Sequence, residues 1–206
     1  MRIVGLTGRI GTGKSTVAAW LAEYGARVVD SDALVAELYE TDATLQGRLR
    51  TQFGQHVVRE ARVDRAVLRR ALVEPAAVAA LEEIVHPAVQ ALRDKKLAAA
   101  RADGTSACVV EAIKLVESGG SAICDELWIV VAGERVQFDR LARRGMEEAE
   151  ARRRMEWQGT PASWTEGFLA ESTRLGEPRP VMIFDNSGSE DQGRAQVSRL
   201  WRGVSL

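Results

Sequence analysis

The chain has 206 residues, of which 46% are hydrophobic and 28% charged, and its formal net charge at pH 7 is −1. This composition is typical of a soluble globular protein and gives no electrostatic reason to expect a nucleic acid or an anionic membrane as partner. The two cysteines indicate reduced thiols rather than a disulfide framework, and no apolar run is long enough to cross a bilayer. We therefore expect a cytoplasmic protein that is a monomer, with oligomers left open by the sequence.

The first predicted elements are an apolar strand at residues 2–7 and a helix from Ser15 to Tyr24, joined by the sequence GRIGTGKS. This octapeptide fits Gly-x-x-x-x-Gly-Lys-[Ser/Thr], a loop whose backbone N–H groups turn toward phosphate oxygens. The helix dipole favours an anion at the same point. We expect Lys14 to reach the β- and γ-phosphates of a nucleoside triphosphate and Ser15 to bind Mg²⁺. The expected nucleotide contacts in the loop are Gly8, Gly11, Thr12, Gly13, Lys14, Ser15 and Thr16.

A second short strand, predicted at residues 26–29, leads into Asp30 and Asp32. Open α/β sheets bind ligands at the carboxyl ends of their strands, and side chains two residues apart in an extended segment point the same way. Both carboxylates are therefore expected to face the nucleotide, where one of them would orient or deprotonate an acceptor hydroxyl. The alternative is that Asp32 caps the helix that follows it.

A long helical region is predicted from residue 33 to 102, with bends or boundaries at Gly54, Pro75 and the pair His86-Pro87. Further strands are predicted at residues 106–112, 127–131 and 181–184, and the last of them precedes a closing helix. The alternation of strands and helices predicts a parallel sheet with helical crossovers.

An arginine-rich amphipathic stretch is predicted from residue 134 to 158, and residues 159–180 are expected to have only a short helical centre. Gln137, Arg140 and Arg144 recur at spacings of three and four, so they would share one helical face. Such a face would close over a triphosphate, neutralise charge on the transferred phosphoryl group and exclude water. The alternative, which spacing alone favours, is a solvated face on which arginines and glutamates pair.

Taken in order, these residues resemble the dephospho-coenzyme A kinase family, the P-loop kinases of the last step of coenzyme A synthesis. The resemblance runs from end to end. Its motifs are Gly5–Gly8 running into the P-loop, Val28–Asp32, Asp64-Arg65 with Leu68, Leu81-Glu82, His86-Pro87, Glu111–Gly119, the series Gln137, Arg140, Arg144, Arg154 and Gln158, and Asp185–Ser189. Many families share a P-loop, and it is the ordered set that is specific.

The resemblance implies a three-layer α/β P-loop kinase fold with a parallel sheet, a helical substrate-binding insert and a helical lid, all in one domain over residues 1–206. The core would comprise about residues 1–32, 105–133 and 180–206, the insert about 33–104 and the lid about 134–179. It also implies an ATP-dependent phosphotransferase that uses Mg²⁺. The enzyme would transfer the γ-phosphoryl group of ATP to the ribose 3′-hydroxyl of its small-molecule substrate, dephospho-coenzyme A.

Residue roles follow from the same resemblance. Asp32 would be the base or positioning group for the acceptor hydroxyl, and Lys14 and Arg140 would hold the transferred phosphoryl group. Arg144 would lie close by, and Asn186 would lie along the adenine of ATP. The implied acceptor-binding residues are Asp32, Asp64, Arg65, His86 and Lys114. Two alternatives stay open: that His86 beside its proline marks a helix start, and that Lys114 pairs with Glu111 at helical spacing.

Three features depart from the family pattern: Arg9 replaces a small glycine, Ile113-Lys114 replaces Pro-Leu, and residues 159–180 form a longer link. Arg9 would contact phosphate or point to solvent. A regulatory GTPase is disfavoured because the chain's single Asn, Asn186, precedes Ser187, so no Asn-Lys-x-Asp motif exists. The remaining alternatives are another small-molecule P-loop kinase and a non-catalytic ATP-binding module.

Overall fold

The computed structural model describes residues 1–204 and contains two compact units. The first, which we call the sheet unit, comprises Met1–Val29 and the chain from Ala99 onward. The second, the helical unit, comprises Asp30–Ala98. No helix within residues 1–204 has the length and apolar character needed to cross a membrane.

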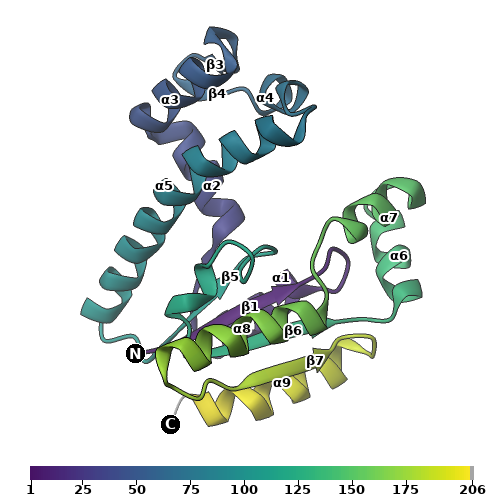
Figure 1. Cartoon of the computed structure of the whole chain (residues 1–206). Helices are drawn as coiled ribbons and strands as arrows, with labels where there is room; N and C mark the ends of the chain where they lie inside the picture. Colours follow the sequence, from purple (N-terminus) through teal and green to yellow (C-terminus); the bar gives the residue numbers. More distant parts are fainter. Residues whose placement is uncertain (205–206) are drawn as a thin grey trace. The chain divides into compact units, whose positions relative to one another are not determined.

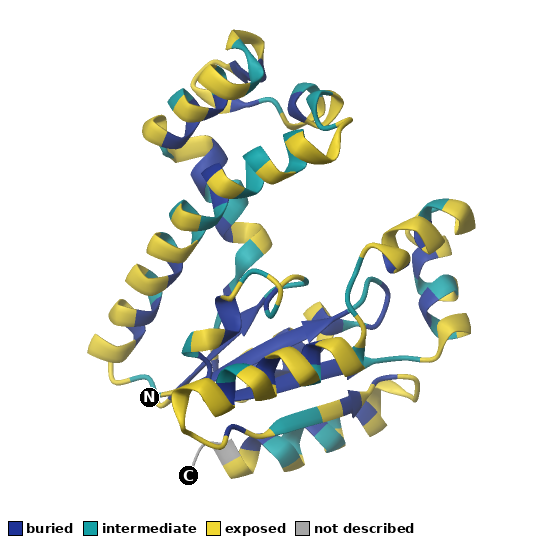
Figure 2. Cartoon of the chain, viewed as in Figure 1, coloured by how far each residue is buried: buried dark blue, intermediate teal, exposed yellow. Residues whose placement is uncertain are grey.

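The sheet unit is built on a central sheet that has five strands within the described part of the chain (Figure 1). Their order is β2 (Arg27–Asp30), β5 (Ala107–Glu111), β1 (Arg2–Gly8), β6 (Glu126–Val131) and β7 (Val181–Asp185). Strand β1 pairs in parallel with β5 and β6, and β6 pairs in parallel with β7. β1 is buried from Ile3 to Gly8, because helices cover both faces of a parallel sheet (Figure 2).

Helices form the two outer layers of this unit. α1 (Lys14–Glu23) and α9 (Glu190–Val204) contact each other and pack on one face through a core that includes Leu6, Trp20 and Trp128. α8 (Pro161–Leu175) contacts β6 and lies on the other face (Figure 1). The predicted three-layer α/β fold with a parallel sheet is therefore confirmed.

Helix α8 corrects the expectation of a short helical centre in residues 159–180, because it is 15 residues long. Its ends carry strong local signals. Thr160 and Ser163 form a capping box, and Gly176 ends the helix in the left-handed conformation with φ of 73°. Trp164 and Phe168, one turn apart, are fully buried and hold the helix on the sheet unit.

The arginine-rich stretch forms two helices rather than one, α6 (Glu134–Ala142) and α7 (Glu148–Glu156), which lie side by side (Figure 1). Gly145, with φ of 77°, lies in the turn between them and donates its N–H to Ala142 O. Arg144 lies beyond the end of α6. The expectation that Gln137, Arg140 and Arg144 share one helical face is therefore wrong for Arg144.

The helical unit packs its elements around a separate core that includes Leu49 and Leu68. Its elements are α2 (Ser31–Thr41), α3 (Ala43–Phe53), the 3₁₀ helix η1 (Gln55–Val57), β3 (Val58–Arg59), β4 (Arg62–Val63), α4 (Arg65–Ala71) and α5 (Pro75–Ala102), whose last turn belongs to the sheet unit. The β3–β4 hairpin interrupts the predicted helical region. Its turn residues Glu60 and Ala61 have φ of 48° and 56° without being glycine, so the usual hairpin signal is absent.

Two of the three expected boundaries in this region are real. Gly54 follows α3, and Pro75 begins α5. His86-Pro87 lies inside α5, so it is neither a helix boundary nor a helix start, and the expected bend at this step stays a prediction. Pro87 is tolerated there although it cannot donate the usual helical hydrogen bond.

Candidate active site

The P-loop connects the end of β1 at Gly8 to the start of α1 at Lys14, as the sequence predicts. Gly11 and Gly13 adopt φ of 82° and 88°, in the region that favours glycine. A Cβ on Gly11 would also lie 3.0 Å from the backbone oxygen of Gln137, so this glycine allows the loop to lie against α6. The turn therefore places successive backbone N–H groups at the N-terminus of a helix, a recurring geometry for binding phosphate.

Lys14 and Ser15 converge on one carboxylate oxygen. The Nζ atom of Lys14 is 2.5 Å from Oε1 of Glu111, and the Ser15 hydroxyl donates to the same oxygen at 2.9 Å. Lys14 is 9% exposed and Glu111 is 3% exposed, so the ion pair is largely shielded from solvent. Glu111 ends β5, the strand beside β1.

Glu111 is the site residue that the sequence analysis missed. An acidic residue at the end of the apolar run Ala107–Val110 is the signal that would have found it, because neighbouring parallel strands end at the same edge of a sheet. The helical spacing expected between Glu111 and Lys114 is wrong, because residues 113–119 form turns. Lys114 is exposed in this turn segment.

The hydroxyl of Ser15 and the carboxylate of Glu111 are oxygen ligands of the kind that Mg²⁺ prefers, and they adjoin each other at the loop. Within residues 1–204 no group of three or more His, Cys, Asp or Glu side chains is arranged to hold a metal. Mg²⁺ with nucleotides is usually held by one or two protein oxygens together with phosphates and water, and Ser15 and Glu111 offer two such oxygens.

Arg140 of α6 binds the backbone of the P-loop. Its Nη1 donates to Thr12 O at 3.0 Å, and its Nη2 donates to Asn186 O at 2.7 Å. Burial, and to a smaller degree the nearby Arg144 and Arg143, lowers the pKa of Arg140 below its ordinary value. Because an arginine stays protonated even so, and no carboxylate in the described part of the chain pairs with Arg140, its positive charge is available to an anion at the loop.

Asn186, which follows β7, supports the P-loop. It is 5% exposed, and its Nδ2 donates to Thr12 O at 2.9 Å. The amide therefore lies against the loop. Contact with adenine stays a prediction, for which the exposed Ser187 and Gly188 are the accessible neighbours.

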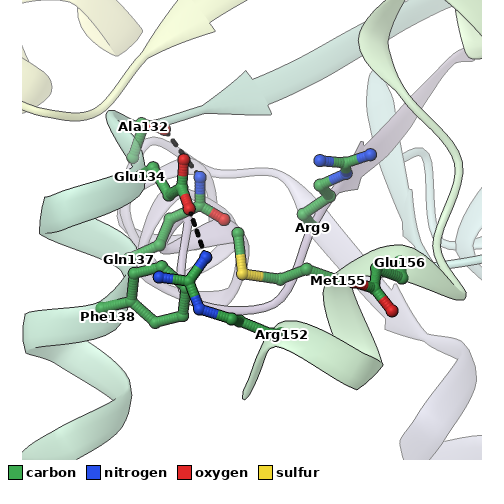
Figure 3. A pocket seen from close by; sticks show the side chains of 8 residues that line it. All are labelled: Arg9, Ala132, Glu134, Gln137, Phe138, Arg152, Met155 and Glu156. Carbon is green, nitrogen blue, oxygen red and sulfur yellow. Dashed lines mark hydrogen bonds and ion pairs between the residues drawn. The ribbon is translucent and has the colours of Figure 1, made fainter. Parts of the chain in front are cut away.

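A cavity of about 360 Å³ lies between the P-loop and the α6–α7 pair (Figure 3). Its lining residues are Arg9, Ala132, Glu134, Gln137, Phe138, Arg152, Met155 and Glu156. Arg152 stacks 4.6 Å from the centre of the Phe138 ring and pairs with Glu134 and Glu148. The walls carry two positive and two negative side chains, so the cavity has no marked preference for an anion.

The arginines of α7 fit the solvated-face interpretation. Arg153 and Arg154 both pair with Glu150, at 2.7 Å each, on the surface. Arg144, in the turn after α6, is exposed. Of the arginines in the series, the structure therefore brings Arg140 to the P-loop and leaves Arg144 and Arg154 at the surface.

The helical unit contains the other predicted site residues. Asp30 caps α2 by accepting from the N–H of Asp32 at 2.8 Å, so the capping role proposed for Asp32 belongs to Asp30. Asp32 lies in the first turn of α2, and the expectation that the two carboxylates share an extended segment is wrong.

Asp64, Arg65 and His86 have local surroundings of their own in this unit. Asp64 caps α4 by accepting hydrogen bonds from the backbone N–H groups of Val67 and Ala66. These bonds, the one from Val67 most of all, lower the pKa of Asp64 below its ordinary value. The guanidinium of Arg65 lies 5.6 Å from the centre of the Tyr39 ring. His86 is half-buried within α5.

Comparison with known proteins agrees with this geometry. The family model described as dephospho-CoA kinase (CoaE) matches residues 2–164. The chain belongs to the dephospho-CoA kinase family. Membership of a kinase family makes it an enzyme and disfavours a non-catalytic ATP-binding module.

Individual relatives cover nearly the whole chain. A dephospho-CoA kinase from Symbiobacterium thermophilum is 40% identical over 207 residues, which are 99% of this chain and 82% of the relative. A crystal structure of a Thermus thermophilus protein aligns with a TM-score of 0.75 at 29% identity, over 100% of this chain and 98% of that one. A dephospho-CoA kinase from Campylobacter jejuni has the same fold, with a TM-score of 0.66 at 17% identity over 100% and 98% of the two chains.

Proposed function

We propose that this member of the family is a dephospho-CoA kinase that transfers the γ-phosphoryl group of ATP to the ribose 3′-hydroxyl of dephospho-CoA, which completes coenzyme A. The observation that carries the proposal is the arrangement around the P-loop. A buried lysine and a serine meet a strand-end carboxylate at the loop, and an arginine that has no carboxylate partner within residues 1–204 binds the loop backbone. Family membership names the acceptor.

Different residues at the loop would stabilise different charges of the bound nucleotide. Phosphoryl transfer depends chiefly on positioning and on stabilising charge, because the protein has little covalent chemistry to perform. The N–H groups at the start of α1 would bind the phosphates, and Lys14 would exchange its contact with Glu111 for a phosphate oxygen. Arg140 would add positive charge beside the transferred group, with Arg144 near it. Mg²⁺ would be held by Ser15 with Glu111, and when bound it neutralises phosphate charge.

The acceptor side is assigned to the helical unit. Asp32 would orient the 3′-hydroxyl or accept its proton, and its place just beyond the carboxyl end of β2 supports this. Arg65 and His86, with Lys114 of the sheet unit, would contact the acceptor, and Asp64 would shape its site as the cap of α4. In these terms the helical unit corresponds to the acceptor-binding insert and α6–α7 to the lid. A cytoplasmic monomer completes the proposal.

A turnover assay with Mg·ATP and a panel of acceptors tests the proposal. The panel contains dephospho-CoA, shikimate, gluconate and a nucleoside. We expect ADP to form only with dephospho-CoA, together with a product that carries one additional phosphate on the ribose. ADP release that is independent of dephospho-CoA, or greater with another acceptor, would overturn the assignment.

A further inference from the structure

The segment between α7 and α8, residues 157–160, is hydrogen-bonded to the P-loop, and we call it the lid joint. Two bonds, both donated by the P-loop, make the connection. The N–H of Ile10 donates to Oε1 of Gln158 at 2.8 Å, and Nε of Arg9 donates to the carbonyl oxygen of Gly159 at 2.9 Å. The backbone of the P-loop thus binds a side chain of the lid joint, and a side chain of the P-loop binds the backbone of the lid joint.

Close packing holds the lid joint in place. A Cβ on Gly159 would lie 2.6 Å from Oε1 of Glu117, so a larger residue would displace the joint. The same oxygen accepts from Nε1 of Trp164 at 2.7 Å, and Trp164 is 1% exposed at the start of α8. The joint therefore rests on the buried part of the sheet unit. Trp157, by contrast, is 82% exposed.

Helix α6 is bonded to the same loop. Arg140, in the last turn of α6, donates to Thr12 O, and Gln158 follows α7, so both the α6 helix and the segment after α7 bind P-loop residues between 9 and 12. The N–H groups of a P-loop ordinarily turn toward phosphate. Because Gln158 accepts the N–H of Ile10, it determines the orientation of that peptide.

We propose that Gln158 is a positioning residue for phosphoryl transfer, acting through the Ile10 peptide, with Arg9 as the second contact. The inference rests on the proposed function. A displaced loop would misplace the transferred phosphoryl group relative to its acceptor, and a misplacement of about 1 Å can cost on the order of a hundredfold in rate. Binding of ADP depends mainly on the N–H groups at the start of α1, which Gln158 does not contact. The joint should therefore control kcat more than ADP affinity.

The first experiment compares Gln158→Met with Gln52→Met, a matched change at an exposed position on α3. For Gln158→Met we expect kcat to fall about tenfold or more. Its Kd for ADP should stay within about twofold and its melting temperature within about 2 °C of the parent. Gln52→Met should match the parent throughout. A kcat within twofold of the parent, or a parallel loss of kcat, ADP affinity and melting temperature, would overturn the proposal.

The second experiment restores the acceptor oxygen. Gln158→Glu keeps an oxygen at the position that accepts the Ile10 N–H but adds negative charge near the nucleotide. We expect most of the kcat lost in Gln158→Met to return at saturating ATP, while KM for ATP rises because of charge repulsion. A Gln158→Glu variant as slow as Gln158→Met would show that the hydrogen bond is not responsible.

The test of Gln158 can be distinguished from the test of the proposed function. Turnover of the parent with dephospho-CoA tests the function, and the ratio of variant to parent tests the role of Gln158. Turnover with whichever alcohol the acceptor panel identifies should give the same ratio, because each phosphoryl transfer uses the same loop. The inference therefore remains testable even if the acceptor proves to be a different alcohol.

Discussion

The helices α6 and α7 both carry arginines but use them differently. Arg140 of α6 contacts backbone carbonyls of the P-loop and has no carboxylate partner in the described part of the chain. Arg153 and Arg154 of α7 pair with Glu150 on the surface. Both helices carry arginines together with acidic residues, so the difference lies in what surrounds each side chain. An arginine bound to carbonyl groups can still offer its positive charge to an anionic ligand, whereas the charge of a paired arginine is already neutralised by a carboxylate.

The neighbouring carboxylates Asp30 and Asp32 extend this comparison, and the largest predicted effect tests it. If Asp32 orients or deprotonates the acceptor, Asp32→Asn should lower kcat by roughly 10²–10⁴-fold while ATP affinity and melting temperature stay close to the parent. Asp30→Asn should remain active, because asparagine caps a helix almost as well as aspartate. The measurements are kcat, an ATP titration and a thermal melt. A fully active Asp32→Asn enzyme would contradict the catalytic role.

Lys14 and Glu111 form a buried pair, in contrast to the exposed pairs of α7. We expect Lys14→Ala to lower kcat by about a hundred- to a thousandfold, because one preorganised donor to developing charge is lost. The change also leaves Glu111 buried without its cation, which lowers the melting temperature. The double variant Lys14→Ala/Glu111→Gln should recover stability but not turnover. Recovery of turnover, or a single variant within threefold of the parent, would place Lys14 outside the transfer step.

A matched pair of substitutions tests the two helices directly. Arg140→Met should lower kcat about a hundredfold, because it removes a cation beside the transferred group. Arg153→Met should stay within about twofold, because exposed ion pairs contribute little. Steady-state kinetics at saturating substrates measure both. Equal losses in the two variants would remove the distinction between α6 and α7.

The smallest effect concerns the pH dependence of α7. Hydrogen bonds from Arg153 and then Arg154 lower the pKa of Glu150 below its ordinary value of 4.5. A carboxylate with a lowered folded-state pKa contributes stability above its unfolded pKa and loses it as pH falls through the folded value. The parent should therefore melt slightly above Glu150→Gln at pH 7, and the difference should vanish in acid well below pH 4.5. A difference that persists in acid would mean that the pair is not responsible.

Local patterns predicted the parts of the fold that depend on nearby residues. The strand, glycine loop and helix around Lys14 follow from spacing over about twenty residues. The β3–β4 hairpin escaped prediction because Glu60 and Ala61 are not typical turn residues. The division between α6 and α7 escaped because charge spacing continues through the turn at Gly145, although the glycine itself was a signal.

The site contacts that the sequence did not reveal join residues that are far apart along the chain. Glu111 meets Lys14 across 97 positions, and Gln158 meets Ile10 across 148, so no local pattern relates them. Asp30 and Asp32 show a second limit. Both suit a helix start, and only the hydrogen bond to the N–H of Asp32 shows which of them caps it.

The exposed indole of Trp157 has a spectroscopic consequence. The chain has five tryptophans, and Trp20, Trp128, Trp164 and Trp201 are each at most 5% exposed. An aqueous quencher such as iodide should therefore reach Trp157 selectively, and its emission should lie at longer wavelength than that of the others. Because Trp157 directly precedes Gln158, unlabelled protein carries a fluorescent reporter within the lid joint. Stopped-flow quenching can then follow nucleotide arrival at the P-loop, and Trp157→Phe supplies the blank.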